Sequence, residues 1–166
     1  MTVMFDGAGL KAEALAAKQF NGVLTNNKEH QYADIDLFVK GKDNKERSIS
    51  VKDQLWSSSK YGAIQVELTL CNTRNNKTID GCFNSSKADY YFWRVSVDGK
   101  DSWLVIECCA MRQYVKENMA SLKQWSTRPN TEERNRSYGR TYDRAMGVVL
   151  PINTIKHLGK VIEVVQ

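Results

Sequence analysis

The sequence predicts an α/β or α+β domain in which a mixed β-sheet is flanked by helices. Segments with helical periodicity and segments with strand-like alternation follow one another along the chain, which is typical of that class. The 166 residues suffice for a hydrophobic core, so we expect residues 1–166 to form a single domain. Hydrophobic residues make up 42% and charged residues 26%, as in ordinary globular proteins.

A helix is predicted over residues 8–20, where apolar side chains recur at helical spacing and Asn21-Gly22 follows as a stop signal. Its apolar stripe consists of Leu10, Ala14, Ala17 and Phe20. Glu13 lies on the side of this stripe, and a carboxylate in such a place needs a partner. A metal ion or Lys52 would supply one; alternatively Glu13 lies at the edge of the stripe and reaches solvent.

Alternating apolar and polar residues predict the first three strands. Residues 33–40 and 47–53 alternate on either side of a polar turn at 41–46, and together they predict a β-hairpin. Residues 62–71 predict a third strand, and a polar, Asn-rich stretch follows over residues 72–86.

The second half of the chain is expected to begin with another hairpin. Its strands are residues 88–97 and 102–108, joined by a turn at 98–100. A helix is expected over residues 110–124, and residues 126–144 are polar, basic and expected to be irregular. The last segments are an apolar run at 146–150, a short helix at 152–159 and a strand at 160–165.

Composition narrows the classes of function. The chain has no long apolar run for a membrane helix and no secretory signal at its start, so we expect a cytoplasmic protein without a membrane partner. The net charge of +5 suits a polyanionic partner. Neither histidine lies near a serine or cysteine motif, and the cysteines lack the paired spacing of zinc sites, so a histidine triad and a zinc centre are disfavoured.

The apolar pattern of the first hairpin selects its strand pairing. Side chains alternate between the two faces of a strand, and a slip of one residue would exchange the faces. If the hairpin folds about Asp43, Leu37 lies opposite Ile49 and Ile35 lies opposite Val51. These four apolar side chains are then expected to share one face.

The same pairing brings chemically active side chains together on the other face. Asp36 falls opposite Ser50, and Asp34 falls opposite Lys52, with directly opposite Cβ atoms about 5 Å apart. Carboxylates suit a hard cation such as Mg²⁺ or Mn²⁺, which would polarise a phosphate and activate a water molecule for in-line attack. Lys52 would stabilise the transition state. The structural alternative is a solvated, ion-paired sheet face.

These segments resemble the PD-(D/E)xK nuclease superfamily, which includes restriction endonucleases, Holliday-junction resolvases and some homing endonucleases. The resemblance begins with the helix that carries Glu13 and the strands ADIDLFV (33–39) and SISVKDQ (48–54). It continues in the hairpin of residues 88–106 and in the closing segment of residues 147–165, and so covers most of the chain. It implies a restriction-endonuclease-like core and phosphodiester hydrolysis.

The resemblance also implies roles for single residues. The metal-binding aspartate would be Asp36 or else Asp34, the catalytic lysine Lys52, and the acidic residue of the first helix Glu13. The main-chain carbonyl of Val51 would be a further metal ligand.

Ser50 departs from the superfamily pattern, since the position two before the lysine is usually Glu, Asp or Gln. Serine is a shorter and weaker metal ligand. Either Asp34 across the hairpin or Glu67 on the next strand would supply the missing carboxylate, or the protein has kept binding and lost catalysis.

A basic segment is the candidate DNA contact. Arginine forks onto phosphate and tyrosine stacks on bases or binds phosphate, so we expect the basic segment of residues 112–144, in which tyrosines interleave with arginines over 137–144, to bind DNA, unless it forms only a solvated surface. The candidates are Arg134, Arg136, Tyr138, Arg140 and Arg144, together with Gln54, which matches a glutamine near the DNA in the superfamily.

We therefore predict a Mg²⁺-dependent DNA endonuclease (Mn²⁺ being an alternative cofactor) that is able to act as a homodimer. A compact, solitary nuclease-like domain fits a phage or mobile-element product, which would act in the host cytoplasm. Two alternatives remain open. One is a catalytically inactive nuclease-fold protein that binds nucleic acid, and the other is a small interaction or inhibitor protein.

Overall fold

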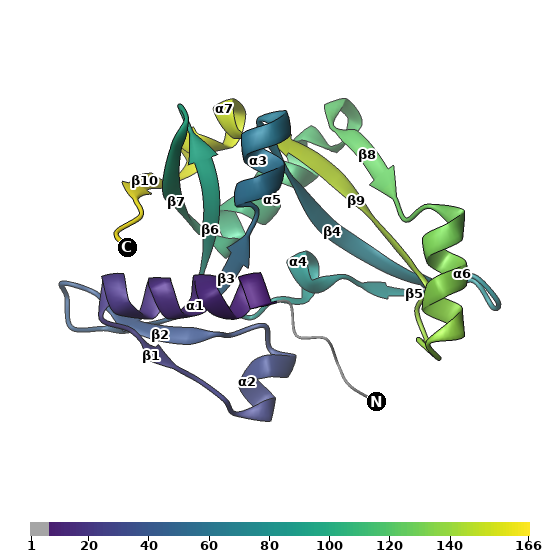
Figure 1. Cartoon of the computed structure of the whole chain (residues 1–166), viewed down its shortest axis with the longest axis horizontal. Helices are drawn as coiled ribbons and strands as arrows, with labels where there is room; N and C mark the ends of the chain where they lie inside the picture. Colours follow the sequence, from purple (N-terminus) through teal and green to yellow (C-terminus); the bar gives the residue numbers. More distant parts are fainter. Residues whose placement is uncertain (1–6) are drawn as a thin grey trace.

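Two β-sheets form the framework of the computed structural model, which describes residues 7–166 (Figure 1). The larger sheet contains, in spatial order, β1 (Val23–Leu24), β2 (Leu37–Lys40), β3 (Glu46–Asp53), β6 (Tyr90–Val97), β7 (Lys100–Glu107) and β10 (Lys160–Glu163). The smaller sheet contains β5 (Lys77–Asp80), β4 (Ala63–Asn72), β9 (Arg144–Pro151) and β8 (Lys123–Ser126). Strands β3 and β6 are parallel and the other neighbours are antiparallel, so the predicted mixed sheet is confirmed.

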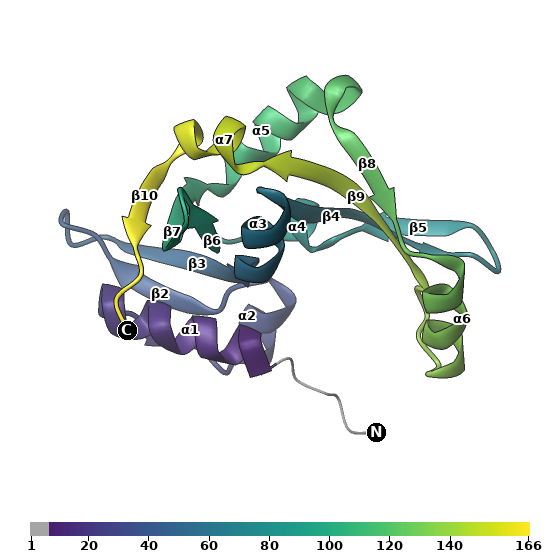
Figure 2. The ribbon, with the colours of Figure 1, turned by 45° about the horizontal axis from the view of Figure 1, so that its top comes forward.

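Helices cover the sheets or extend from their edges (Figure 2). They are α1 (Gly7–Phe20), α2 (Lys28–Tyr32), α3 (Leu55–Tyr61), α4 (Cys82–Ser85), α5 (Cys108–Asn118), α6 (Pro129–Ser137) and α7 (Ile152–Ile155), with 3₁₀ turns at Met119–Ser121 and Lys156–Leu158. The predicted α/β or α+β class is therefore confirmed. Within the described residues, none of these helices combines the length and apolar character needed to cross a bilayer.

The larger sheet has a hydrophobic core on each face. On one face α1 packs Ala12 and Ala16, both fully buried, against a cluster that includes Leu37, Ile49 and Trp103. The core on the other face joins apolar residues of β6 and β7 to those of β4, β9 and α5. The two sheets thus pack against each other on the side opposite α1.

The predicted apolar stripe of α1 is confirmed at Phe20, which packs against Phe92 and Trp103, and is wrong in its first half. Leu10 is 53% exposed and Ala14 is exposed, whereas Ala12 and Ala16 face the sheet. Two small side chains at i and i+4 let the helix approach the strands closely. The close packing gained in this way stabilises the fold more than burial of the larger Leu10 side chain would. Glu13, next to Ala12, is consequently half-buried at the edge of the contact.

The pairing of the first hairpin is as predicted, because Leu37 lies opposite Ile49. The strand itself is shorter than predicted, since β2 begins at Leu37 rather than at residue 33. Asp34 adopts the left-handed conformation, with φ 58°, and the regular strand does not extend through it. Ile35 therefore packs against the core on the opposite side of the sheet from Leu37, which corrects the expected common face.

Other boundaries also differ from the sequence prediction. Helix α3 was not predicted; it ends at Gly62, whose φ of 64° suits glycine. The expected helix over 110–124 ends at Asn118 and is followed by a 3₁₀ turn and β8. Residues expected to be irregular contain α6, which begins with Pro129 and has no apolar stripe to reveal it. Short elements also interrupt the polar stretch over 72–86, namely β5 and α4.

Candidate active site

Asp34 and Lys52 form the centre of the candidate site. The Lys52 ammonium lies 2.5 Å from Asp34 Oδ1, and both side chains are largely shielded from solvent. Ser50, fully buried in β3, donates its hydroxyl hydrogen to Asp34 Oδ2 at 2.7 Å. The hairpin pairing thus brings Asp34 and Lys52 together as expected. Ser50 has no carboxylate of its own, but its hydroxyl holds the carboxylate of Asp34 beside it.

Asp36 is held by the main chain of the neighbouring strand. Its Oδ2 accepts a hydrogen bond from the Val51 amide at 2.7 Å, and its own amide donates to the carbonyl of Ile49. Strand β2 begins only at Leu37, so the Val51 amide of β3 has no main-chain acceptor in a regular neighbouring strand. The Asp36 carboxylate accepts this hydrogen bond instead. Its position is therefore fixed by backbone geometry rather than by a flexible side-chain partner.

Glu13 brings a third carboxylate to the same region from α1. Burial and the nearby charge of Asp36 raise the pKa of Glu13, and Lys52 offsets only part of this rise. Burial likewise raises the pKa of Asp36 against the lowering effects of the Val51 amide and Lys52. These two carboxylates lack enough positive charge around them, which is common at functional sites.

Lys52 remains charged in this setting. Burial alone would lower the pKa of Lys52, but the charge of Asp34, the hydrogen bond to Asp34 and the charge of Asp36 together raise it. A lysine with a raised pKa is a poor proton acceptor and a good stabiliser of negative charge. The geometry therefore favours an electrostatic role for Lys52 over that of a general base.

Lys52 also lines a cleft of about 240 Å³ between the two sheets. The polar lining consists of Lys52, Gln54, Gln65, Glu67 and Cys82, and the aromatic lining consists of Phe83, Tyr91, Trp93 and Trp125. Gln54 follows β3 directly, and its side-chain Oε1 accepts a 3.4 Å hydrogen bond from the Gln65 amide. Two of the sequence-predicted residues, Lys52 and Gln54, thus face the same space.

Glu67 and Cys82 enter the cleft from β4 and α4. Gly81 makes this possible, since a Cβ there would lie 2.8 Å from the Glu67 carbonyl oxygen. The Cys82 amide donates to Glu67 Oε1 at 3.2 Å, and burial raises the pKa of the Cys82 thiol. Sequence reasoning proposed Glu67 only as a replacement for Ser50. It missed Cys82, because no local pattern predicts how α4 packs on β4.

The carboxylates do not form a ready-made metal cage. Within residues 7–166, no group of three or more His, Cys, Asp or Glu side chains has a metal-ligating arrangement. The oxygen donors nonetheless suit Mg²⁺, which keeps several water molecules and is often bound through only one or two carboxylates. Glu13 and Asp36 fit best, because burial, the main cause of their raised pKa values, disfavours their charged forms, and a bound cation would offset that effect.

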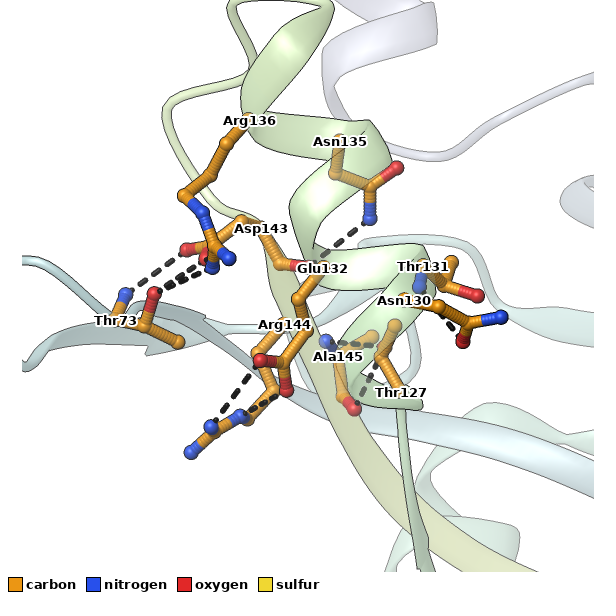
Figure 3. A network of polar contacts seen from close by, with 10 residues as sticks. All are labelled: Thr73, Thr127, Asn130, Thr131, Glu132, Asn135, Arg136, Asp143, Arg144 and Ala145. Atoms are coloured by element: carbon orange, nitrogen blue, oxygen red, sulfur yellow. Dashed lines mark hydrogen bonds and ion pairs between the residues drawn. The ribbon is translucent and has the colours of Figure 1, made fainter.

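The candidate DNA-contacting arginines fall into two groups. Arg136 pairs with the buried Asp143 at 2.6 Å, and Arg144 pairs with the buried Glu132 at 2.6 Å (Figure 3). Thr73 also donates to Asp143 through both its amide and its hydroxyl. These contacts fasten α6 to β4 and β9, so Arg136 and Arg144 have a structural task in addition to any contact with DNA.

The remaining basic and aromatic candidates point to solvent. Arg134 and Arg140 are exposed, although Arg140 donates to Asn135 at 3.2 Å, and the Tyr138 side chain is 61% exposed. In both views α6 lies at the far end of the smaller sheet from α1 and β3 (Figures 1 and 2). DNA bound at Lys52 would therefore reach α6 only with nucleotides distant from those at Lys52.

No protein-family model, curated protein or solved structure matches the chain. The resemblance to PD-(D/E)xK nucleases thus rests on the segments from which it was inferred, and the function must be argued from the chemistry of the site.

Proposed function

We propose that the protein is a metal-dependent endonuclease that hydrolyses phosphodiester bonds of DNA. The observation that carries this proposal is the cluster of Glu13, Asp34 and Asp36 around Lys52, in which the pKa values of Glu13 and Asp36 are raised. Clustered carboxylate charges destabilise the folded state, and binding of a cation together with a phosphate would compensate for that destabilisation. The succession of α1, the β2–β3 hairpin and the parallel pair β3–β6 supports a restriction-endonuclease-like core.

The chain's own residues suit this chemistry. Glu13 and Asp36, with the main-chain carbonyl of Val51 as the resemblance implies, would hold Mg²⁺ or Mn²⁺. A bound divalent cation supplies charge neutralisation at the phosphate and a more acidic water molecule. Lys52, kept protonated by Asp34, stabilises the negative charge that develops on the phosphate oxygens. Asp34, fixed by Ser50 and Lys52, supplies the carboxylate that Ser50 lacks.

DNA is the polyanion that this site favours. The net charge of +5 attracts a phosphate backbone, and Gln54 lies in the cleft beside Lys52. The exposed Arg134, Tyr138 and Arg140 would contact the backbone further along the substrate. A homodimer would place two such sites on the two strands.

A second candidate is a nuclease-fold protein that binds DNA without cutting it. The observation that favours it is the engagement of both Asp34 oxygens by Ser50 and Lys52, with which a metal would have to compete for that carboxylate. The two candidates differ in cleavage and agree in binding.

The test is to incubate the protein with supercoiled plasmid, branched DNA and RNA in Mg²⁺, Mn²⁺ or EDTA. We expect metal-dependent DNA cleavage that falls by about a thousandfold or more in Lys52→Ala and Asp36→Ala. The matched control is Asp43→Asn, which breaks the exposed Asp43–Arg47 pair in the same hairpin and should leave cleavage unchanged.

The other outcomes separate the rivals. DNA binding without cleavage in any metal would support the inactive binding protein. Neither cleavage nor binding would support an interaction or inhibitor protein, in which the charged hairpin face forms ion pairs only. Cleavage that persists in Lys52→Ala and Asp36→Ala would place the active site elsewhere.

A further inference from the structure

Helix α3 carries an exposed aromatic surface directly after the strand of Lys52. Trp56 is 68% exposed and Tyr61 is 64% exposed. Their rings meet edge to face, with centroids 5.9 Å apart, and neither ring is buried by another element. Large aromatic side chains on a protein surface indicate a binding site more often than single aliphatic ones do.

Lys60 adds positive charge to this surface. Its ammonium lies 5.0 Å from the centre of the Trp56 ring and 5.3 Å from that of Tyr61. A cation over two aromatic faces is a feature that combines stacking with attraction to phosphate. Trp56, Lys60 and Tyr61 together form what we term the α3 aromatic surface.

The backbone beneath the surface is firmly held. Ser58, buried on the opposite side of α3, donates its hydroxyl hydrogen to the Gln54 carbonyl at 2.7 Å and accepts the Ser96 amide of β6 at 2.8 Å. Gln54, which lines the cleft with Lys52, directly precedes α3. Ser58 and Gln54 thus connect the α3 aromatic surface to the candidate active site.

Resting on the proposed nuclease function, we propose that the α3 aromatic surface stacks on an unpaired base of DNA. The preferred substrate would then contain single-stranded or branched positions beside the scissile phosphate. Bases inside a duplex are already stacked on each other, so only an unpaired or extruded base presents its face to Trp56.

Size and charge argue against other occupants. Two aromatic side chains bury at most about 500 Å², well below the roughly 800 Å² per partner of a stable protein interface. Three serines and Lys60 separate the two aromatic residues in the sequence LWSSSKYG over residues 55–62, and the only other apolar side chain of the helix, Leu55, is half-buried, so the exposed apolar patch is small. The positive charge of Lys60 and of the whole chain complements DNA.

Tryptophan fluorescence gives a direct test. Trp93 and Trp103 are buried, Trp125 is half-buried, and Trp56 alone among the tryptophans is mostly exposed. In EDTA, which separates binding from cleavage, we expect oligo(dT) to quench the wild-type fluorescence, and this quenching to disappear in Trp56→Phe. Binding of labelled oligo(dT) should weaken about tenfold in Trp56→Ala and largely recover in Trp56→Phe, while affinity for blunt duplex DNA stays unchanged.

The matched control is Tyr32→Ala, which removes an aromatic side chain that is 88% exposed on α2. It should leave oligo(dT) affinity as in the wild type. Unchanged oligo(dT) affinity in Trp56→Ala, tighter binding of oligo(U) than of oligo(dT), or a dimer that dissociates in Trp56→Ala would each overturn the proposal.

The two proposals fail separately. Quenching by oligo(dT) without cleavage of any DNA would contradict the nuclease and support the stacking surface. Metal-dependent cleavage of duplex and branched DNA alike, unaffected by Trp56→Ala, would support the nuclease and contradict the stacking surface.

Discussion

Asp34, which is half-buried, and Asp143, which is buried, have similar hydrogen-bond partners and different electrostatic surroundings. Asp34 accepts hydrogen bonds from the Ser50 hydroxyl and the Lys52 ammonium, and Asp143 accepts them from the Thr73 hydroxyl and the Arg136 guanidinium. The two partners of Asp34 both come from β3, whereas those of Asp143 come from the residue after β4 and from α6. The two clusters differ in how many other carboxylates share the cation.

Around Asp143 the charges are balanced. Hydrogen bonds from the Thr73 hydroxyl and amide, followed by that from Arg136, hold the pKa of Asp143 well below its ordinary value. Around Lys52 they are not, because burial raises the pKa values of both Glu13 and Asp36 and the charge of Lys52 lowers them only in part. A balanced pair stabilises the fold, whereas an unbalanced cluster reduces stability unless a bound cation offsets its charge.

Replacing Asp36 by Asn gives the largest expected effect. The amide oxygen still accepts the Val51 amide, but the negative charge is gone. We expect metal-dependent cleavage to fall by about a thousandfold, while the melting temperature rises by roughly 2 °C because a buried charge is removed. Plasmid cleavage and thermal unfolding at pH 7 measure the two changes. A lower melting temperature in Asp36→Asn would mean that the cluster is structural.

Replacing Asp143 by Asn should have the reverse signature. The variant weakens the contacts to Thr73 and Arg136 that fasten α6, so we expect the melting temperature at pH 7 to fall by roughly 5 °C. Cleavage of DNA at saturating enzyme should change less than threefold or so, since Asp143 is remote from Lys52. Equal losses of activity in Asp143→Asn and Asp36→Asn would remove the distinction between the regions.

The pH dependence of stability should differ in sign. Asp143 has a lowered pKa, so its contribution is complete above the ordinary aspartate value of 3.8 and is lost as the pH falls through its folded pKa. Asp36 has a raised pKa, so its destabilising charge is present at neutral pH and is removed as the pH falls through that raised value. The difference in melting temperature between wild type and Asp36→Asn should therefore shrink on mild acidification.

The difference between wild type and Asp143→Asn should persist until the pH approaches 3.8. Thermal scans of the three proteins between neutral and acidic pH test both statements. Parallel curves for the two variants would contradict the assigned charge states.

The smallest expected effect separates two arginines of α6. Arg134 is exposed, and Arg134→Ala should weaken DNA affinity by a few-fold and reduce the salt dependence by about one counterion, without changing stability. Arg136→Ala should instead lower the melting temperature, because it leaves Asp143 without its cation. Salt titrations of DNA binding distinguish the variants. Unchanged affinity of Arg134→Ala at low salt would exclude α6 from the DNA contact.

The part of the site that lies within one hairpin could be predicted from the sequence. Apolar alternation in β2 and β3 fixes the pairing of Leu37 with Ile49, and that pairing places Asp34 beside Lys52. The left-handed turn at Asp34 could not be predicted, because aspartate adopts this conformation only when its surroundings require it. The error in the position of Ile35 follows from that turn.

Contacts between distant segments were beyond sequence reasoning. Cys82 reaches the cleft because Gly81 packs against β4, and Arg136 meets Asp143 because α6 folds back on β9. Neither arrangement has a local periodicity. The class of fold could be predicted because it depends on the order of helices and strands, whereas the cleft depends on how two sheets pack.

The most direct test of the account is the anomalous density of a crystal soaked in Mn²⁺. The account predicts a peak bonded to a carboxylate oxygen of Asp36, at about 2.2 Å, with Glu13 turned toward it and Lys52 still paired with Asp34. No peak near Asp36 at millimolar Mn²⁺, with Glu13 directed to solvent, would contradict the metal site and the endonuclease that depends on it.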